Sequence, residues 1–297
     1  MAQERLSKDQ RRDQARELAR LEREKRQKAE SRTRLLIRVG ATVGILAVLA
    51  AVAGGIYLGT RPAGPGPVNM ASDGILLTGT DGEIRAVETG AVPADGTPVP
   101  TDPDAFDVPA RIQVYADYGC PYCQLFEATN AEQIEELVAS GVATLEMFPV
   151  SILDRAFGGS EYSTRAANAM ACVAAEQPDA YLDASNALFV GAPEEGTTGL
   201  TDDEIRDILD SAGALTDGIS SCIGEQRYAG WVTAATDRAT SNPDLVGASG
   251  GFGTPTILVN GVRYSGALDD AQTFALFVAQ NAEFDDTSTD PTPTPTP

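Results

Sequence analysis

The chain has 297 residues, and 43 Asp and Glu against 22 Lys and Arg give it a formal net charge of −21. This acidity argues against nucleic-acid binding, because contacts to phosphate need clustered Lys and Arg. The sequence contains no histidine. That absence excludes Ser-His-Asp and Cys-His catalytic arrangements and all zinc sites that use histidine.

The N-terminal part of the sequence predicts a membrane anchor. Residues 1–34 carry 12 Lys and Arg and form a charged, solvent-exposed arm. Residues 35–60 follow as an apolar segment, uncharged between Arg38 and Arg61, which is long enough to span a bilayer as one helix. The positive-inside rule places the arm in the cytoplasm and the rest of the chain outside, at the cell membrane. A cleaved signal peptide is the alternative, since the sequence AVA at 51–53 resembles a cleavage site.

Two further segments have the composition of loops. Residues 61–109 are rich in Pro and Gly and predict a linker. Within this linker, the runs 75–78 and 83–88 flank Gly-Thr-Asp-Gly and predict a β-hairpin. At the other end, residues 285–297 form a Thr/Pro tail, which we expect to be extended and disordered.

The remaining residues, 110–284, alternate between strand and helix patterns. The first expected elements are a strand at 111–116, a helix at 121–140 and a strand at 142–150. Five helices follow: 160–177, 178–190, one that starts at the capping box 201–204, 217–223 and 227–240. The last elements are a hairpin of strands 256–259 and 262–265 and a helix at 269–282. This order predicts an α/β fold. It has a mixed sheet with helices on its faces and a helical insertion at about 151–245.

The most informative motif is Cys120-Pro121-Tyr122-Cys123, at the predicted start of a helix. A zinc or iron–sulfur site would need four thiolates, and the other two cysteines are single residues 50 positions apart. Haem attachment needs a histidine after the second cysteine, and the sequence has Gln124 there. A purely structural disulfide would close a very small loop and add little stability. No metal or cofactor is therefore expected.

The local sequence favours disulfide exchange instead. A cysteine at a helix start lies beside unpaired N–H groups and the positive end of the helix dipole, which lower its pKa. Cys120 is then expected to form the mixed disulfide with a substrate. Cys123, one turn further into the helix, is expected to resolve that intermediate. Pro121 suits the first helical turn and stiffens the loop.

Two sequence stretches carry a family resemblance. VYADYGCPYC at 114–123 and GFGTPTILVNG at 251–261 resemble the thioredoxin superfamily, in particular its DsbA-like branch of exported thiol-disulfide oxidoreductases. The resemblance implies a thioredoxin-like α/β fold with a helical insertion, here preceded by the transmembrane helix. It also implies that Pro255 is cis and lies against the cysteine pair. Thr254 and Pro255, with Pro121 and Tyr122, would position the substrate.

The resemblance further implies a function and its partners. The disulfide of Cys120 and Cys123 would pass to exported cysteine-containing proteins, and a membrane reoxidase of the DsbB or vitamin K epoxide reductase type would restore it. Two alternatives stay open. One is a membrane-anchored thiol reductase, for example of the cytochrome c maturation type. The other is a non-enzymatic envelope binding module on the same fold.

The sequence departs from the family pattern at two points. Tyr122 stands where the prototype has histidine, which implies a weaker oxidant. Val114 stands where the family has a buried acid, so the nearest acid is Asp117, which either accepts a proton from Cys123 or caps the turn. The resemblance also implies a structural disulfide between Cys172 and Cys222 in the insertion. The alternative for this pair is two buried thiols.

Overall fold

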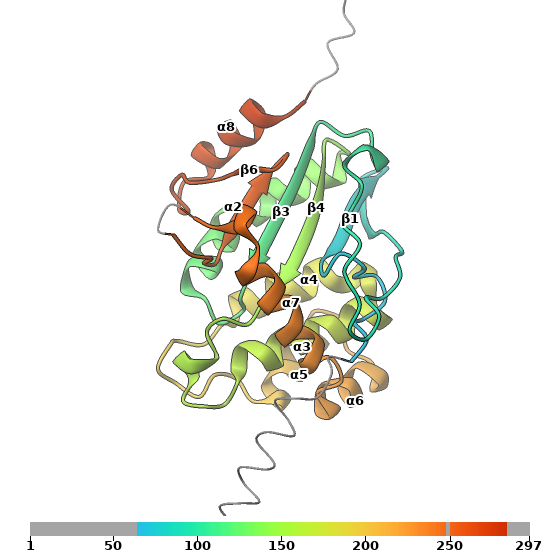
Figure 1. Cartoon of the computed structure of the whole chain (residues 1–297), viewed down its shortest axis with the longest axis vertical. Helices are drawn as coiled ribbons and strands as arrows, with labels where there is room; N and C mark the ends of the chain where they lie inside the picture. The colour runs from blue at the N-terminus through green and yellow to red at the C-terminus, as the bar shows by residue number, and fades with distance from the viewer. Residues whose placement is uncertain (1–63, 248–249, 284–297) are drawn as a thin grey trace, which may run out of the picture. The chain divides into compact units, whose positions relative to one another are not determined.

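The computed structural model describes residues 64–247 and 250–283, which form one folded body (Figure 1). Its strands are β1 (Ile75–Thr80), β2 (Glu83–Ala86), β3 (Ala110–Ala116), β4 (Ala143–Pro149), β5 (Thr256–Val259) and β6 (Val262–Arg263). Its α-helices are α2 (Pro121–Ala139), α3 (Tyr162–Glu176), α4 (Tyr181–Val190), α5 (Asp202–Ser211), α6 (Asp217–Glu225), α7 (Ala229–Ser241) and α8 (Ala271–Asn281). Short 3-10 turns are η1 (Pro103–Ala105), η2 (Asp154–Phe157), η3 (Pro178–Ala180) and η4 (Pro243–Leu245).

The strands form one mixed sheet in the order β2-β1-β4-β3-β5-β6. Only β3 and β4 are parallel, with Ala110 opposite Ala143 and Ala116 opposite Pro149. Their connection is α2, as expected for a parallel pair that needs a crossover. The mixed sheet and the helical insertion predicted from the order of elements are therefore confirmed.

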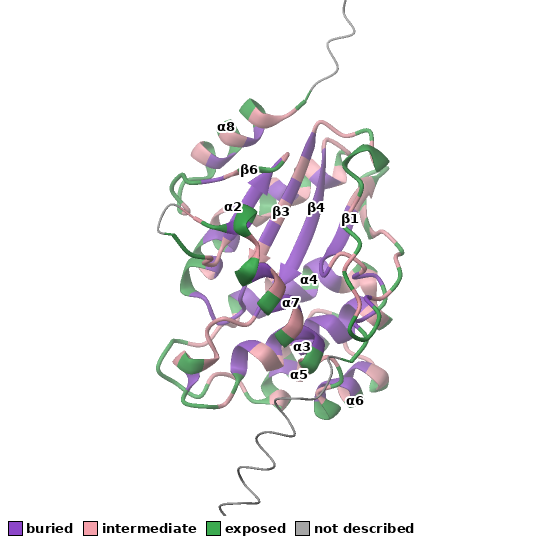
Figure 2. Cartoon of the chain, in the orientation of Figure 1, coloured by how far each residue is buried: buried purple, intermediate pink, exposed green. Residues whose placement is uncertain are grey.

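Burial of the strands follows their place in the sheet. β3 alternates buried and half-buried residues, whereas all seven residues of the central strand β4 are buried (Figure 2). At the other side of β3, the predicted hairpin of β5 and β6 turns at Asn260 and Gly261, with φ of 49° and 78°. Both positive φ angles match the two-residue hairpin turn that Asn-Gly favours.

The helices form two groups around the sheet. α2 crosses one face of the sheet, where it contacts β4 and β1, and α8 packs against α2. Helices α3 to α6 gather beyond the ends of β3 and β4, and α7 runs from this group onto the other face of the sheet, where Ala239 packs with Leu258 of β5 (Figure 1). The first turn of α2 therefore lies where the sheet, α2 and the insertion meet.

Three local details differ from the sequence expectations. The hairpin predicted inside a linker at 61–109 is instead the edge of the sheet, because the apolar residues at the start of β1 are buried against β4. Ser160 does not cap α3, which begins one residue later with Glu161 at its N-cap and no side-chain capping bond. Pro178 starts a 3-10 turn before α4 rather than α4 itself. The capping box between Thr201 and Glu204 is present as predicted.

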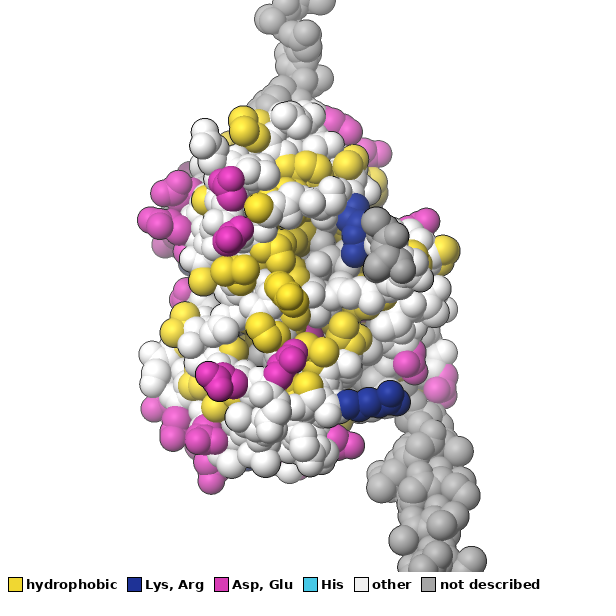
Figure 3. Space-filling view, turned by 90° about the vertical axis from the view of Figure 1, so that its left-hand side faces the viewer, with side chains coloured by type: hydrophobic (Ala, Val, Ile, Leu, Met, Phe, Trp, Pro, Cys, Tyr) yellow, Lys and Arg dark blue, Asp and Glu magenta, His cyan; other side chains and the backbone are white. Residues whose placement is uncertain are grey.

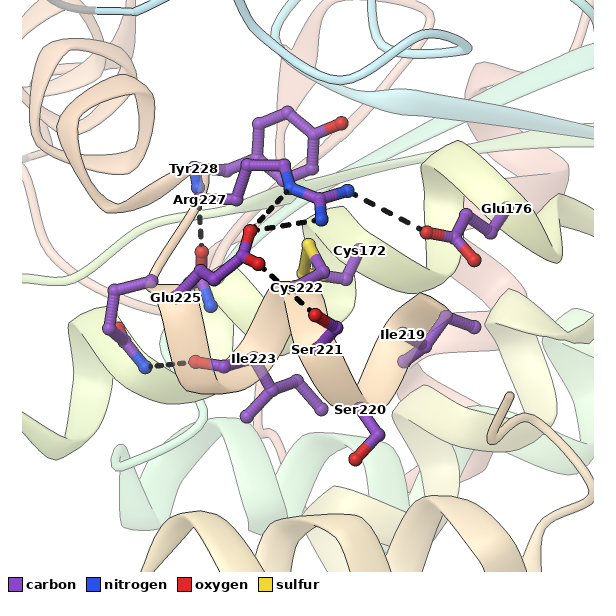
Figure 4. Close-up of a disulfide and its surroundings, with 12 residues drawn as sticks. Cys172, Glu176, Ile219, Ser220, Ser221, Cys222, Ile223, Glu225, Arg227 and Tyr228 are labelled. Atoms are coloured by element: carbon purple, nitrogen blue, oxygen red, sulfur yellow. Dashed lines mark hydrogen bonds and ion pairs between the residues drawn. A yellow bond between two sulfur atoms is a disulfide. The ribbon is translucent and has the colours of Figure 1, made fainter. Parts of the chain in front are cut away.

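A disulfide between Cys172 and Cys222 joins α3 to α6 inside the insertion (Figure 4). Both cysteines are fully buried. Beside them, Arg227 forms ion pairs with Glu225 at 3.0 Å and Glu176 at 3.8 Å. The disulfide thus joins α3 to α6 covalently, and the ion pairs of Arg227 lie beside it.

The predicted arm at 1–34, membrane helix at 35–60 and tail at 285–297 lie outside the described residues. Within 64–247 and 250–283, no helix combines the length and the apolar character that crossing a bilayer requires.

Candidate active site

The cysteine pair lies at the junction of β3 and α2. Cys120 is the N-cap residue of α2, Pro121 is the first helical residue and Cys123 follows within the first turn. The main chain turns at this point because the Cys120 N–H donates to the Asp117 carbonyl oxygen at 2.9 Å. Cys120 therefore lies at the helix N-terminus, where the amide groups and the helix dipole favour a negative charge.

Gly119 permits the close packing behind the pair. A side chain at this position would collide with the ring of Phe157, which is fully buried on η2. The contact brings η2, the first segment of the insertion, directly against the cysteine loop. Only glycine allows the backbone and the aromatic ring to approach so closely.

The loop before β5 completes the site from the far end of the sequence. The Thr254–Pro255 peptide bond is cis, and the Cys120 thiol donates to the Thr254 carbonyl oxygen at 3.3 Å. Cys120 and Thr254 are 134 residues apart in the chain. The structure thus brings together Cys120, Cys123, Thr254 and Pro255, the residues for which the sequence predicted a common site.

The two sulfur atoms lie in opposite electrostatic environments. The pKa of Cys120 is lowered to about 6, first by the hydrogen bond from the Cys123 thiol and then by the side chain of Thr254 and the amides of the first helical turn, against the effect of burial. Burial raises the pKa of Cys123 well above its ordinary value, and the neighbouring Cys120 adds to the rise. At neutral pH the pair can hold a thiolate on Cys120 and a thiol on Cys123.

Asp117 stabilises the loop that carries Cys120 through hydrogen bonds to its carboxylate. Its carboxylate is fully buried and accepts hydrogen bonds from the backbone amides of Gly119 at 2.8 Å, Ile152 at 2.8 Å and Leu153 at 3.0 Å. Burial raises the pKa of Asp117, and these amide donors oppose the rise because they stabilise the carboxylate. These bonds hold the loop against the chain that follows β4, and the charge of Asp117 also adds to the rise in the pKa of Cys123.

Glu127 is a second buried acid, which the sequence reasoning missed. It lies four residues after Cys123 on the same face of α2 and is only 8 % exposed. Burial, with a smaller contribution from Glu135, raises the pKa of Glu127 to about 7. The available signal was a glutamate on the inward face of the predicted helix, one turn beyond the second cysteine.

Tyr118 connects the cysteine loop to the insertion and was also missed. Its hydroxyl lies 3.1 Å from the Ser185 Oγ and 3.5 Å from the Tyr181 hydroxyl, both on α4. Its ring stacks on Phe189 with centroids 4.7 Å apart. These contacts hold the residue two positions before Cys120 in place.

The other predicted site residues divide between surface and interior. Tyr122 is 65 % exposed and Pro121 is exposed, so both face any molecule that approaches Cys120. Cys172 and Cys222 pair with each other in the insertion and take no part in this site.

Comparison with known proteins agrees with this geometry. A family model described as thioredoxin matches residues 102–277, more than half of the chain. The chain belongs to the thioredoxin family. Among similar solved structures, the reduced disulfide bond oxidoreductase DsbG from Mycobacterium tuberculosis is 26 % identical, with a TM-score of 0.50, over 62 % of this chain and 83 % of that protein.

Two solved structures of lower identity share the fold. DsbA from Mycobacterium tuberculosis, in its reduced form, is 22 % identical over 70 % of this chain and 99 % of its own, with a TM-score of 0.50. Oxidised BdbD from Bacillus subtilis is 18 % identical over 75 % of this chain and 98 % of its own, also with a TM-score of 0.50.

A curated relative has a different overall organisation. The serine/threonine-protein kinase PknE from Mycobacterium tuberculosis is 29 % identical over 153 residues, which are 50 % of this chain and 26 % of the kinase. The chain therefore spans about a quarter of the length of the curated relatives that it matches.

Proposed function

We propose that this thioredoxin-family protein is a thiol-disulfide oxidoreductase that donates the Cys120–Cys123 disulfide to exported proteins. The observation that carries the proposal is the position of Cys120 at the N-terminus of α2 against Thr254, with Cys123 buried behind it, an arrangement that lowers the pKa of Cys120 to about 6 and raises that of Cys123. A stable thiolate on Cys120 stabilises the reduced protein and so favours release of its disulfide to a client. The family's DsbG, 26 % identical, supports the same chemistry.

The reaction has two exchange steps. A client thiolate attacks the Cys120 sulfur, the Cys120–Cys123 bond breaks, and Cys123 leaves with the electron pair and takes up a proton. A second client thiolate then attacks the client sulfur of the mixed disulfide. It forms the client disulfide and releases Cys120 as a thiolate. The client loses two electrons, and the cysteine pair gains them.

Glu127 is proposed to manage the proton on Cys123. Glu127 follows Cys123 by one helical turn on the buried face of α2, and its pKa of about 7 is close to the working pH of a general acid or base. Asp117 is less suited, because its oxygens already accept three backbone hydrogen bonds.

The location and the electron acceptor belong to the same proposal. The apolar segment at 35–60, with basic residues before it, supports anchoring at the cell membrane with the folded body outside the cytoplasm. Because each turnover leaves Cys120 and Cys123 reduced, the cycle needs a reoxidase. A membrane enzyme of the DsbB or vitamin K epoxide reductase type would fit such an anchored protein.

The decisive experiment measures both catalysis by the cysteine pair and the direction of electron transfer. Oxidised protein is mixed with a reduced, unfolded client, and client disulfides are counted for the wild type and for Cys120→Ser. We expect rapid oxidation by the wild type and none by the variant. Equilibration with glutathione should give a reduction potential near or above roughly −200 mV. A potential close to about −270 mV would favour the reductase alternative, and full activity of Cys120→Ser would exclude catalysis by this pair.

A further inference from the structure

The surface around Cys120 is apolar on the side of α2. Tyr122 is 65 % exposed and Leu125, one turn later on the same helix, is 40 % exposed. Figure 3 turns the left-hand side of Figure 1 toward the viewer, the side on which α2 begins. It shows hydrophobic side chains across the middle of this face. Large apolar side chains exposed beside a reactive thiol mark a contact surface for another chain.

One other segment extends this apolar surface. Leu153, just before η2, and Ala156, on η2, are half-buried beside the cysteine loop, where Phe157 packs on Gly119. Apolar groups therefore lie beside Cys120 on α2 and at η2.

The segment next to η2 is acidic. Glu194 and Glu195 are exposed in the loop after α4, and the Gly196 N–H ties this loop to η2 by donating to the Ala156 carbonyl oxygen at 2.8 Å. Glu161 is exposed at the N-terminus of α3. We call Glu161, Glu194 and Glu195 the acidic rim. Figure 3 shows acidic side chains both above and below the hydrophobic band.

The folded body offers few cations to neutralise the rim. The described residues include 33 Asp and Glu but only 8 Arg and no Lys. Five of the arginines form ion pairs with carboxylates elsewhere: Arg85, Arg165, Arg206, Arg227 and Arg238. On η2 itself the one cation is Arg155, which is exposed. The face around Cys120 thus combines an apolar centre with net negative charge.

Resting on the proposed oxidoreductase function, we propose that this face selects apolar client segments whose cysteine is flanked by Lys or Arg. The apolar side chains of such a segment dock on Tyr122 and Leu125, and its cations meet the acidic rim. The field of the rim raises the rate of encounter with cationic segments, and salt screens it. Lys or Arg beside the client cysteine also lowers that cysteine's pKa, which supplies the attacking thiolate.

The test compares two dithiol peptides with the same apolar sequence, one flanked by Lys and the other by Glu. Each is oxidised by the full-length oxidised protein at low and high salt, and a small uncharged disulfide, bis(2-hydroxyethyl) disulfide, measures the intrinsic reactivity of each peptide. After this correction we expect the Lys peptide to react about tenfold faster at low salt, with the ratio falling as salt rises. Glu194→Gln/Glu195→Gln should reduce the ratio.

The control variant is Asp81→Asn/Glu83→Gln, which removes the same charge at the turn between β1 and β2. This turn follows Gly79, which packs on Val138 at the far end of α2 from Cys120, so the control should keep the wild-type ratio. Equal rates for the two peptides, or equal ratios in both variants, would overturn the inference and leave the proposed function standing. Failure to oxidise either peptide or dithiothreitol would overturn the proposed function itself.

Discussion

At the scale of single residues, Cys120 and Cys123 differ in reactivity although both are almost fully buried, at 4 % and 1 % exposure. Cys120 has the helix N-terminus, the Cys123 thiol and the Thr254 side chain around its sulfur, whereas Cys123 is buried near the carboxylate of Asp117. Contacts to the charged form, rather than exposure, therefore decide which cysteine reacts.

Replacing Cys123 tests the origin of the low pKa of Cys120. In Cys123→Ala the largest contact that lowers this pKa is lost, so the pKa should rise above about 6. Cys123→Ser keeps a hydroxyl donor and should give a smaller rise. The measurement is the rate of alkylation of the reduced protein against pH. An unchanged midpoint in Cys123→Ala would show that the helix and Thr254 alone set the value.

Glu127→Gln tests the buried carboxyl. Its folded-state pKa of about 7 lies above the ordinary 4.5, so the folded protein keeps a proton that the unfolded chain loses between these values. Wild-type stability therefore falls as pH rises from about 4.5 to about 7, a loss that Gln avoids. Relative to the wild type, the free energy of unfolding of Glu127→Gln should increase by up to about 3 kcal/mol as pH rises through this window, and it should not increase further above about pH 7.

Denaturant unfolding of wild type and Glu127→Gln at several pH values measures this difference. Glu136→Gln, an exposed position on the same helix, is the control and should show no such trend. A difference between Glu127→Gln and the wild type that did not change with pH would mean that burial does not perturb Glu127. Slower release of Cys123 in the variant would further support the proposed proton transfer.

At the scale of elements, the insertion supports the site through three connections to the thioredoxin core. Phe157 of η2 packs on Gly119, Tyr118 bonds to α4, and Asp117 accepts amides from the chain after β4. The Cys172–Cys222 disulfide then ties α3 to α6 behind these contacts. The insertion is thus part of the wall of the active site.

Removing this disulfide should lower stability without changing the chemistry of Cys120. The bond closes a loop with a sequence separation of 50, so Cys172→Ala/Cys222→Ala should lower the free energy of unfolding by about 3–4 kcal/mol. Denaturant unfolding measures the loss, and alkylation against pH should still give a midpoint near 6 for Cys120. Unchanged stability would contradict a structural role for the bond.

Element boundaries show which sequence signals were reliable. The capping box at Thr201 and the Asn260-Gly261 turn act locally, and both appear as predicted. Ser160 has an equally good capping side chain but does not cap α3, and its hydroxyl is buried without a partner in the described structure. The start of α3 is therefore set by the packing of the chain around η2 rather than by the capping preference of Ser160.

At the scale of the whole molecule, the segment before β1 is bound to the insertion. Asp73 is buried and accepts from the Trp231 Nε1 at 3.1 Å and from the Arg238 guanidinium at 2.6 and 2.7 Å. The Asn69 side chain donates to the Ala174 carbonyl oxygen. Residues that the sequence assigned to a linker therefore join the sheet to α7 and α3.

Asp73→Asn tests this connection. Loss of the carboxylate leaves the half-buried Arg238 without its counter-charge, and we expect a loss of about 2–3 kcal/mol in unfolding free energy. Fluorescence of Trp231, the single tryptophan of the chain, should change in the folded state. Glu83→Gln breaks the exposed pair with Arg85 and should cost under about 1 kcal/mol. Similar losses in both variants would contradict a special role for Asp73.

The sequence by itself determined the features that depend on local order along the chain. Composition excluded histidine chemistry, and the period of the apolar residues predicted the strands and helices. The CPYC motif at a helix start and the distant Thr254-Pro255 predicted the residues of the site. The helix, strand and turn signals act within a few residues, whereas the link between the cysteine pair and Thr254-Pro255 came from the family resemblance.

Only the tertiary structure decided which groups surround the two sulfurs. Glu127 and Tyr118 have an ordinary appearance in the sequence, and their properties arise because the fold buries Glu127 on α2 and packs Tyr118 against α4. The edge position of the β1–β2 hairpin likewise follows from pairing with β4, more than 60 residues away. Burial and long-range contacts set pKa values and sheet order, and neither can be read from neighbouring residues in the chain.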